Sequence, residues 1–136
     1  MKNYMLITCL LGNLLLWGCS AEELQSSISS QNQTTVITTG NPTAHEILKN
    51  DPKADIFQWN GTIYQTNIYW VNELVLSEGD FVGVINYHTS NPNNFKDSSA
   101  NVLPIGTEIY KVNERNDILL TKYNGELKYY YQLVEG

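Results

Sequence analysis

Cysteine and basic residues are scarce in this chain of 136 residues. It has two cysteines, and eight Lys and Arg residues against 14 Asp and Glu, for a net charge of −6. Binding to nucleic-acid phosphates depends on clustered Lys and Arg, so this balance argues against a nucleic-acid partner. Charged residues make up 16% of the chain, below the ~25% of an average globular protein, yet nine tyrosines are present. Disordered chains combine high charge with few aromatics, so we expect one folded domain.

Catalytic and metal-binding motifs are also missing from the sequence. It has no Gly-x-Ser-x-Gly elbow, no phosphate-binding Gly-x-x-x-x-Gly-Lys, no His-Glu-x-x-His and no Asp-rich calcium loop. The two histidines, His45 and His88, have no Cys or His neighbour at ligand spacing, so we interpret both as exposed side chains. We interpret Glu78 and Asp80 as residues of a solvent-exposed turn and not as a catalytic pair. Acid–base catalysis by two carboxyl groups needs different environments that separate their pKa values. We therefore predict no catalytic residue, no metal site and no cofactor.

The first 18 residues predict an export signal. Lys2 supplies one positive charge, about a dozen mostly apolar residues follow, and the small residue Gly18 precedes Cys19. A bilayer span takes about 20 apolar residues, so a permanent transmembrane helix is the less favoured alternative for this short run.

The tetrapeptide Leu16-Trp17-Gly18-Cys19 resembles the lipobox of bacterial lipoproteins. Leu16 fits the aliphatic position, Gly18 the small position and Cys19 the invariant position, whereas Trp17 departs from the pattern. The resemblance implies cleavage before Cys19 and acylation of its thiol, which would hold the protein on the extracytoplasmic face of the cell membrane. Two or more acyl chains, such as palmitate, anchor a protein stably. In layout, the chain resembles the small exported lipoproteins of Gram-positive bacteria.

The cysteine count agrees with this interpretation. Cys9 lies in the segment that cleavage would remove, which would leave Cys19 as the only cysteine of the mature chain. One cysteine forms no internal disulfide, although small secreted folds often need such bonds, and acylation would remove a free thiol from an oxidising space. The alternative is that Cys19 is an ordinary thiol after another kind of signal.

Residues 19–41 predict a flexible polar linker, and residues 42–136 a single small domain. Ser, Thr, Gln and Asn dominate the linker, and its few apolar residues follow no period, so it cannot bury enough surface to offset chain entropy. As an alternative, residues 34–39 could add an edge strand.

The domain is predicted to begin with a short helix and a hairpin. Thr43 and Glu46 have the spacing of a capping box, which predicts a two-turn helix that ends at Asp51-Pro52. Asn60-Gly61 then predicts a type I′ turn in a hairpin over residues 55–65. A two-residue turn would pair Trp59 with Thr62 and Phe57 with Tyr64.

The middle of the domain predicts further short elements. Residues 69–76 space their apolar side chains like one amphipathic helix, with a strand as the alternative. A turn at residues 78–80 would lead into a strand over 81–88, with a bulge or bend at Gly83. A long polar loop over 89–102 and a strand over 107–112 follow. The sequence thus predicts a mainly β fold: a small antiparallel sheet or half-open barrel with one or two short helices.

The last hairpin, over residues 117–134 with its turn at Asn124-Gly125, predicts one buried and one wetted face. Alternation assigns to the buried face Ile118, Leu120, Tyr129, Tyr131 and Leu133, and to the other face Thr121, Glu126 and Lys128. It also places Tyr123 and Tyr130 on the outer face. These two form our candidate binding surface for a sugar, peptide or protein, because tyrosine buries ring area and still hydrogen-bonds. The interpretation that we favour from the sequence, however, is that the aromatic rings simply fill the core of a small barrel.

Two functions from different classes follow from the sequence. The favoured one is a non-enzymatic lipoprotein, anchored in the membrane through Cys19, that binds a protein, peptide or other envelope component. The alternative is a small envelope hydrolase that uses Asp or Glu near the loop 89–102. A concave pocket with two or more titratable groups would favour the enzyme, and a flat surface with exposed tyrosines the binding module.

Overall fold

The computed structural model describes residues 40–135. The predicted signal (1–18), Cys19, nearly all of the linker (19–41) and the alternative strand 34–39 lie outside the described residues. Within residues 40–135 no helix is long and apolar enough to cross a bilayer. The helices are α1 (Ala44–Asn50), α2 (Tyr69–Asn72) and the 3-10 helix η1 (Pro92–Asn94). The strands are β1 (Ile56–Trp59), β2 (Thr62–Gln65), β3 (Glu78–Val84), β4 (Tyr87–His88), β5 (Ser99–Ala100), β6 (Glu108–Val112), β7 (Ile118–Tyr123) and β8 (Glu126–Leu133).

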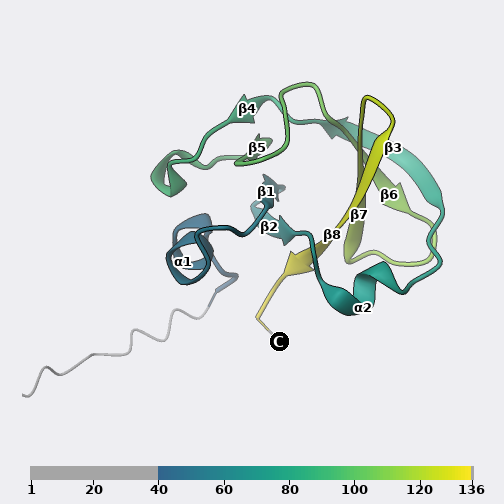
Figure 1. Ribbon diagram of the computed structural model, residues 1–136, viewed down its shortest axis with the longest axis horizontal. Coiled ribbons are helices and arrows are strands. Elements are labelled where there is room, and N and C mark those ends of the chain that lie inside the picture. Colours follow the sequence, from purple (N-terminus) through teal and green to yellow (C-terminus); the bar gives the residue numbers. More distant parts are fainter. Residues whose placement is uncertain (1–39, 136) are drawn as a thin grey trace, which may run out of the picture. The chain divides into compact units, whose positions relative to one another are not determined.

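All eight strands belong to one curled sheet, in the order β3-β6-β7-β8-β2-β1-β5-β4. Every pair is antiparallel except β4 with β5. Figure 1 shows the strands arranged around a ring. This is the mainly β, half-open barrel that the sequence predicts.

The two ends of the strand order, β3 and β4, are consecutive in the chain and are joined only by Ile85 and Asn86. Ile85 is fully buried. Its N–H donates to the Thr107 carbonyl oxygen at 2.9 Å, and its own carbonyl oxygen accepts from the Gly106 N–H at 2.8 Å. One bent segment thus links both ends of the sheet, which explains why the sheet curls.

The local predictions for α1 and the first hairpin are confirmed. Glu46 Oε2 accepts a hydrogen bond from the Thr43 N–H at 2.8 Å, and Thr43 Oγ1 accepts one from the Glu46 N–H at 3.3 Å. Asn60 and Gly61 have φ values of 49° and 75°, the positive values that a type I′ turn requires. The predicted pairs Phe57–Tyr64 and Trp59–Thr62 are present.

Gly83 marks a register shift between β3 and β6, as predicted for a bulge. A Cβ atom at Gly83 would collide with the indole ring of Trp59. Only glycine lets the bent strand lie this close to the ring.

Four predictions in the middle of the domain are wrong in part. The helix predicted over 69–76 is limited to α2. Beyond it, just before β3 begins, the Ser77 N–H donates to the Glu114 carboxylate (2.9 Å to Oε2). The predicted turn at 78–80 belongs to β3, and the strand predicted over 81–88 is divided between β3 and β4. The loop 89–102 contains η1 and β5, since Ala100 pairs with Phe57.

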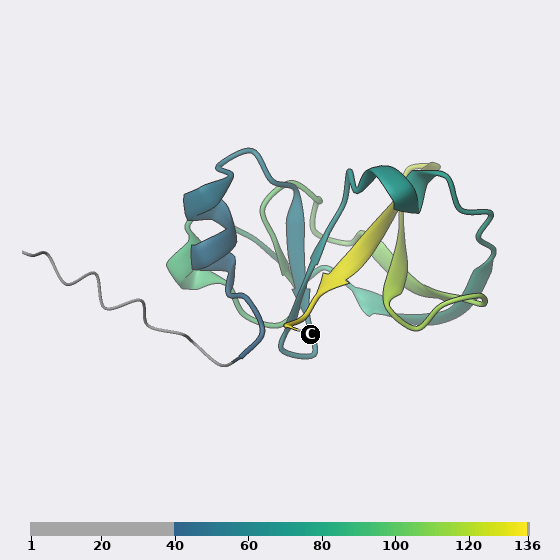
Figure 2. The ribbon, with the colours of Figure 1, turned by 90° about the horizontal axis from the view of Figure 1, so that it is seen from below.

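The strands β6, β7 and β8 are covered on both faces, so the predicted wetted face of the last hairpin is wrong. Inside the ring, a buried cluster contains Phe57, Tyr64, Ile85, Leu103, Ile109, Leu119 and Tyr130. On the opposite face, Val71 of α2 packs with Val112, Ile118 and Leu120. A third cluster joins Ala44 of α1 to Ile56 and Ile63. Figure 2 shows the two helices on separate parts of the sheet.

Candidate functional site

Tyr130 does not lie on a binding surface, because its side chain is fully buried. Its hydroxyl donates to Asp55 Oδ1 at 2.8 Å, and its ring packs edge-on against Phe57 with centroids 4.9 Å apart. Burial, and then the negative charge of Asp55, raise the pKa of Tyr130 far above its ordinary value, so the hydroxyl keeps its proton. The alternation of side chains along the hairpin correctly places Tyr123 and Tyr130 on one face of the sheet. Because the sheet curls, the part of that face that carries Tyr130 lies in the hydrophobic core.

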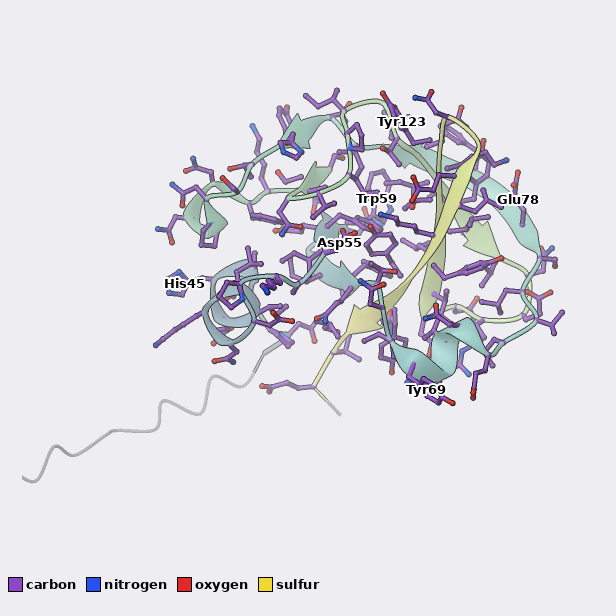
Figure 3. All side chains as sticks on the ribbon, in the orientation of Figure 1. His45, Asp55, Trp59, Tyr69, Glu78 and Tyr123 are labelled. Atoms are coloured by element: carbon purple, nitrogen blue, oxygen red, sulfur yellow. The ribbon has the colours of Figure 1, made fainter. Side chains whose placement is uncertain are left out.

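Tyr123 remains accessible, with 38% of its surface exposed. It lies at the end of β7, and Figure 3 shows it at the periphery while Asp55 lies in the interior. Beside Tyr123 is a depression of about 400 Å³, within the size range of small-molecule sites. One wall consists of Val102, Leu103 and Pro104, and the hairpin β7–β8 supplies Thr121, Tyr123, Asn124, Glu126 and Lys128. We call it the Tyr123 depression.

On the polar wall of the Tyr123 depression, the positive charge of Lys128 is offset by two carboxylates. Lys128 Nζ lies 3.5 Å from Asp55 Oδ2 and 3.6 Å from Glu126 Oε1. The Asp55 side chain is 9% exposed and that of Lys128 34%, so the ammonium group lies between a buried and an exposed carboxylate. The depression therefore offers hydrogen-bonding groups without an excess of positive charge.

The apolar wall is held in place by side-chain hydrogen bonds. Asn101 Nδ2 donates to the Ala54 carbonyl oxygen at 2.7 Å, and Asn101 Oδ1 accepts from the Ile56 N–H at 2.9 Å. Thr107 Oγ1 donates to the Pro104 carbonyl oxygen at 2.7 Å. Both ends of segment 101–104 are thus fixed, and a wall that is already ordered costs less entropy when a ligand binds.

The histidines and acids considered in the sequence analysis lie apart from one another. His45 is exposed on α1, and His88 Nδ1 lies 3.1 Å from the Leu103 carbonyl oxygen. Glu78 pairs with Lys122 at 2.6 Å, whereas Asp80 is exposed on β3. Among residues 40–135, no three His, Cys, Asp or Glu side chains are grouped so as to hold a metal ion.

The loop 89–102 has a single acidic residue, Asp97. Its Oδ1 accepts a hydrogen bond from the Gly61 N–H at 2.7 Å and lies 3.5 Å from Gln58 Nε2. This carboxylate therefore supports the β1–β2 turn.

Sequence reasoning missed Asp55, Val102 and Pro104 as parts of this region. Their proximity to the last hairpin depends on the curl of the whole sheet, which no local pattern reveals. An acid directly before the buried strand β1 was the one available signal for Asp55, since buried carboxylates need partners.

Comparison with protein-family models, with curated proteins and with solved structures finds no significant match to this chain. We therefore infer its function from the motif at Cys19 and from the geometry of residues 40–135.

Proposed function

We propose that this chain is an exported lipoprotein, anchored at the extracytoplasmic face of the membrane through Cys19, whose domain binds an envelope component without catalysing a reaction. The observation that carries the anchoring is the tetrapeptide Leu16-Trp17-Gly18-Cys19 at the end of an apolar run that begins after Lys2. An acylated Cys19 would tether the domain to the bilayer while the domain itself stays in water.

The binding role is supported by the Tyr123 depression. An exposed ring beside a fixed apolar wall and a few hydrogen-bonding side chains is the usual composition of a ligand site. Tyr123 can cover an apolar face of the ligand, while Asn124 and Lys128 can hydrogen-bond its polar groups. Because Lys128 is already balanced by Asp55 and Glu126, a neutral polar ligand fits best, such as a sugar or an uncharged stretch of peptide.

The hydrolase alternative has less support. Asp97, the one acid of the loop 89–102, is committed to the Gly61 N–H. The Tyr123 depression does meet the criterion that favours an enzyme, since the titratable side chains Tyr123, Glu126 and Lys128 line it. Glu126 and Lys128, however, lie 3.6 Å apart as an ion pair. Acid–base catalysis instead needs two titratable groups whose different environments separate their pKa values. Turnover of a glycan or peptide that is abolished by Glu126→Gln would favour the enzyme over the binding module.

Anchoring is tested by Cys19→Ser in the producing cell, with Cys9→Ser as the matched control. We expect Cys19→Ser protein in the culture medium or as uncleaved precursor. Cys9→Ser protein should stay in the membrane, because Cys9 lies in the segment that cleavage removes. Mass spectrometry of the natural product should show a diacylglyceryl-modified residue at position 19. Normal membrane retention of the Cys19→Ser protein would refute the lipid anchor.

A further inference from the structure

A second depression, of about 470 Å³, lies beside α1. Three side chains that carry or can accept a positive charge line it: His45, Lys49 and Lys53. Its apolar lining includes Leu48, Pro52 and Val102. Figure 3 shows His45 at the outer side of the domain, on α1. We call this the α1 depression.

The local sequence brings the three basic side chains together. His45 and Lys49 are four residues apart on α1, so they lie on one face of the helix. The helix ends at Asp51, and the chain then turns so that Lys53 lines the same depression. The helix dipole favours a positive charge in the last turn, where Lys49 lies, and disfavours one in the first turn, where His45 lies. Helix stability therefore does not explain the whole cluster.

The lysines of the α1 depression form no ion pair with the acids of their own segment. Among the described residues, neither Lys49 nor Lys53 has a carboxylate oxygen within 4.0 Å. The same holds for Lys96 and Lys111, whereas Arg115, Lys122 and Lys128 each have one. The Glu46 carboxylate accepts hydrogen bonds from the N–H and hydroxyl of Thr43, both at 2.8 Å. Asp51 Oδ1 accepts one from the Lys53 N–H at 3.0 Å. The ammonium groups of Lys49 and Lys53 are thus left to contact a ligand, while Glu46 and Asp51 hydrogen-bond within the segment.

We propose that the α1 depression binds a phosphate group carried on a small organic residue, such as glycerol. The two ammonium groups and the imidazole are donors for phosphate oxygens, and such charge-assisted bonds are the stronger kind. Leu48, Pro52 and Val102 provide a surface for the carbon part of the ligand. A soluble phosphoester and a phospholipid headgroup share this chemistry. The site does not depend on the lipid at Cys19, so either proposal can fail alone.

The test uses the full chain, purified in a neutral detergent and followed by amide chemical shifts in NMR. It is titrated with inorganic phosphate and with glycerol 3-phosphate, and separately its micelles are doped with phosphatidylglycerol. We expect saturable shifts that are confined to α1 and to residues near 53, 90 and 101. Glycerol 3-phosphate should bind more tightly than inorganic phosphate, because only the ester contacts the apolar wall.

The decisive variant is Lys49→Gln/Lys53→Gln, and its matched control is Lys96→Gln/Lys111→Gln, which changes the net charge equally. Loss of two exposed charge contacts should weaken binding of the phosphoester about tenfold in the first variant, with little change in the second. All four side chains are exposed, so both variants should remain folded.

Each outcome bears on the proposal. Binding of glycerol 3-phosphate in solution assigns a soluble or polymeric phosphoester, and binding confined to doped micelles assigns a lipid headgroup. Equal weakening in the test and control variants would show only non-specific attraction and overturn the site. Equal affinity for inorganic phosphate and the ester would overturn the role of the apolar wall. Absence of saturable shifts with every probe would overturn the whole proposal.

Discussion

The Tyr130 hydroxyl and the Asp55 carboxylate form a hydrogen bond of 2.8 Å between residues that are 75 positions apart in the chain. Both side chains are buried, and Asp55 has a second partner in Lys128. The bond ties β8 to the residue before β1 across the intervening strand β2, on the inner side of the curled sheet. It also gives a buried carboxylate the partners without which burial would be costly.

Loss of this bond should lower stability measurably. Tyr130→Phe keeps the ring and removes the donor to Asp55, so we expect the free energy of unfolding to fall by about 1.5–3 kcal/mol in urea titrations. Tyr123→Phe is the matched control, because the Tyr123 hydroxyl donates no hydrogen bond within residues 40–135, and it should change stability by less than about 0.5 kcal/mol. Equal stability of the two variants would mean that the bond contributes nothing.

The close approach of Gly83 to Trp59 predicts a strong steric effect. Gly83→Ala should lower the free energy of unfolding by about 1–3 kcal/mol, as is typical of overpacking. The loss should be smaller when Gly83→Ala is combined with Trp59→Ala, since the ring that meets the new methyl group is then absent. A double-mutant cycle in urea measures this coupling. Additive effects would show that the Trp59 ring is not what makes a side chain unfavourable at position 83.

Stability should also depend on pH through Glu114. Hydrogen bonds from the Ser77 hydroxyl and N–H lower the pKa of Glu114 below 4.5. A carboxyl whose pKa is lower in the folded state stabilises the fold above its unfolded pKa, and this contribution is lost as the pH falls through the folded value. We therefore expect Glu114→Gln to flatten the decline of stability below about pH 4.5. Glu73→Gln, which removes an exposed carboxylate with no hydrogen bond in the described part, should leave the slope of the wild type.

The Tyr123 depression predicts a loss of binding without a loss of stability. Tyr123→Ala should reduce crosslinking of the envelope partner on living cells, because the ring forms the exposed edge of the site. Tyr69→Ala is the control, since Tyr69 is more exposed, at 78%, and lies on α2. Both variants should unfold at nearly the same urea concentration as the wild type. Unchanged crosslinking of Tyr123→Ala would place the binding surface elsewhere.

Features fixed by a few neighbouring residues could be predicted from the sequence. The capping box of Thr43 and Glu46 and the Asn60-Gly61 turn depend on local conformation, and the structure has both. The bulge at Gly83 was also signalled by a single residue, although its contact with the Trp59 ring was not. The attachment of the chain after α2 could not be predicted, because Ser77 hydrogen-bonds to Glu114, 37 residues away. The same holds for Tyr130: a strand reveals which side chains share a face, but not which face the remaining chain will cover.

The position of β8 has a consequence for how the domain folds. Among residues 40–135 this strand comes after all the others, yet it lies between β7 and β2 in the sheet and delivers Tyr130 to the interior. Pairing of residues 63–65 with 131–133 must therefore wait until synthesis has passed Leu133. Before that moment the nascent polypeptide lacks a central strand and cannot assemble its core. Folding of the sheet therefore follows the synthesis of residues 40–133 and does not accompany it.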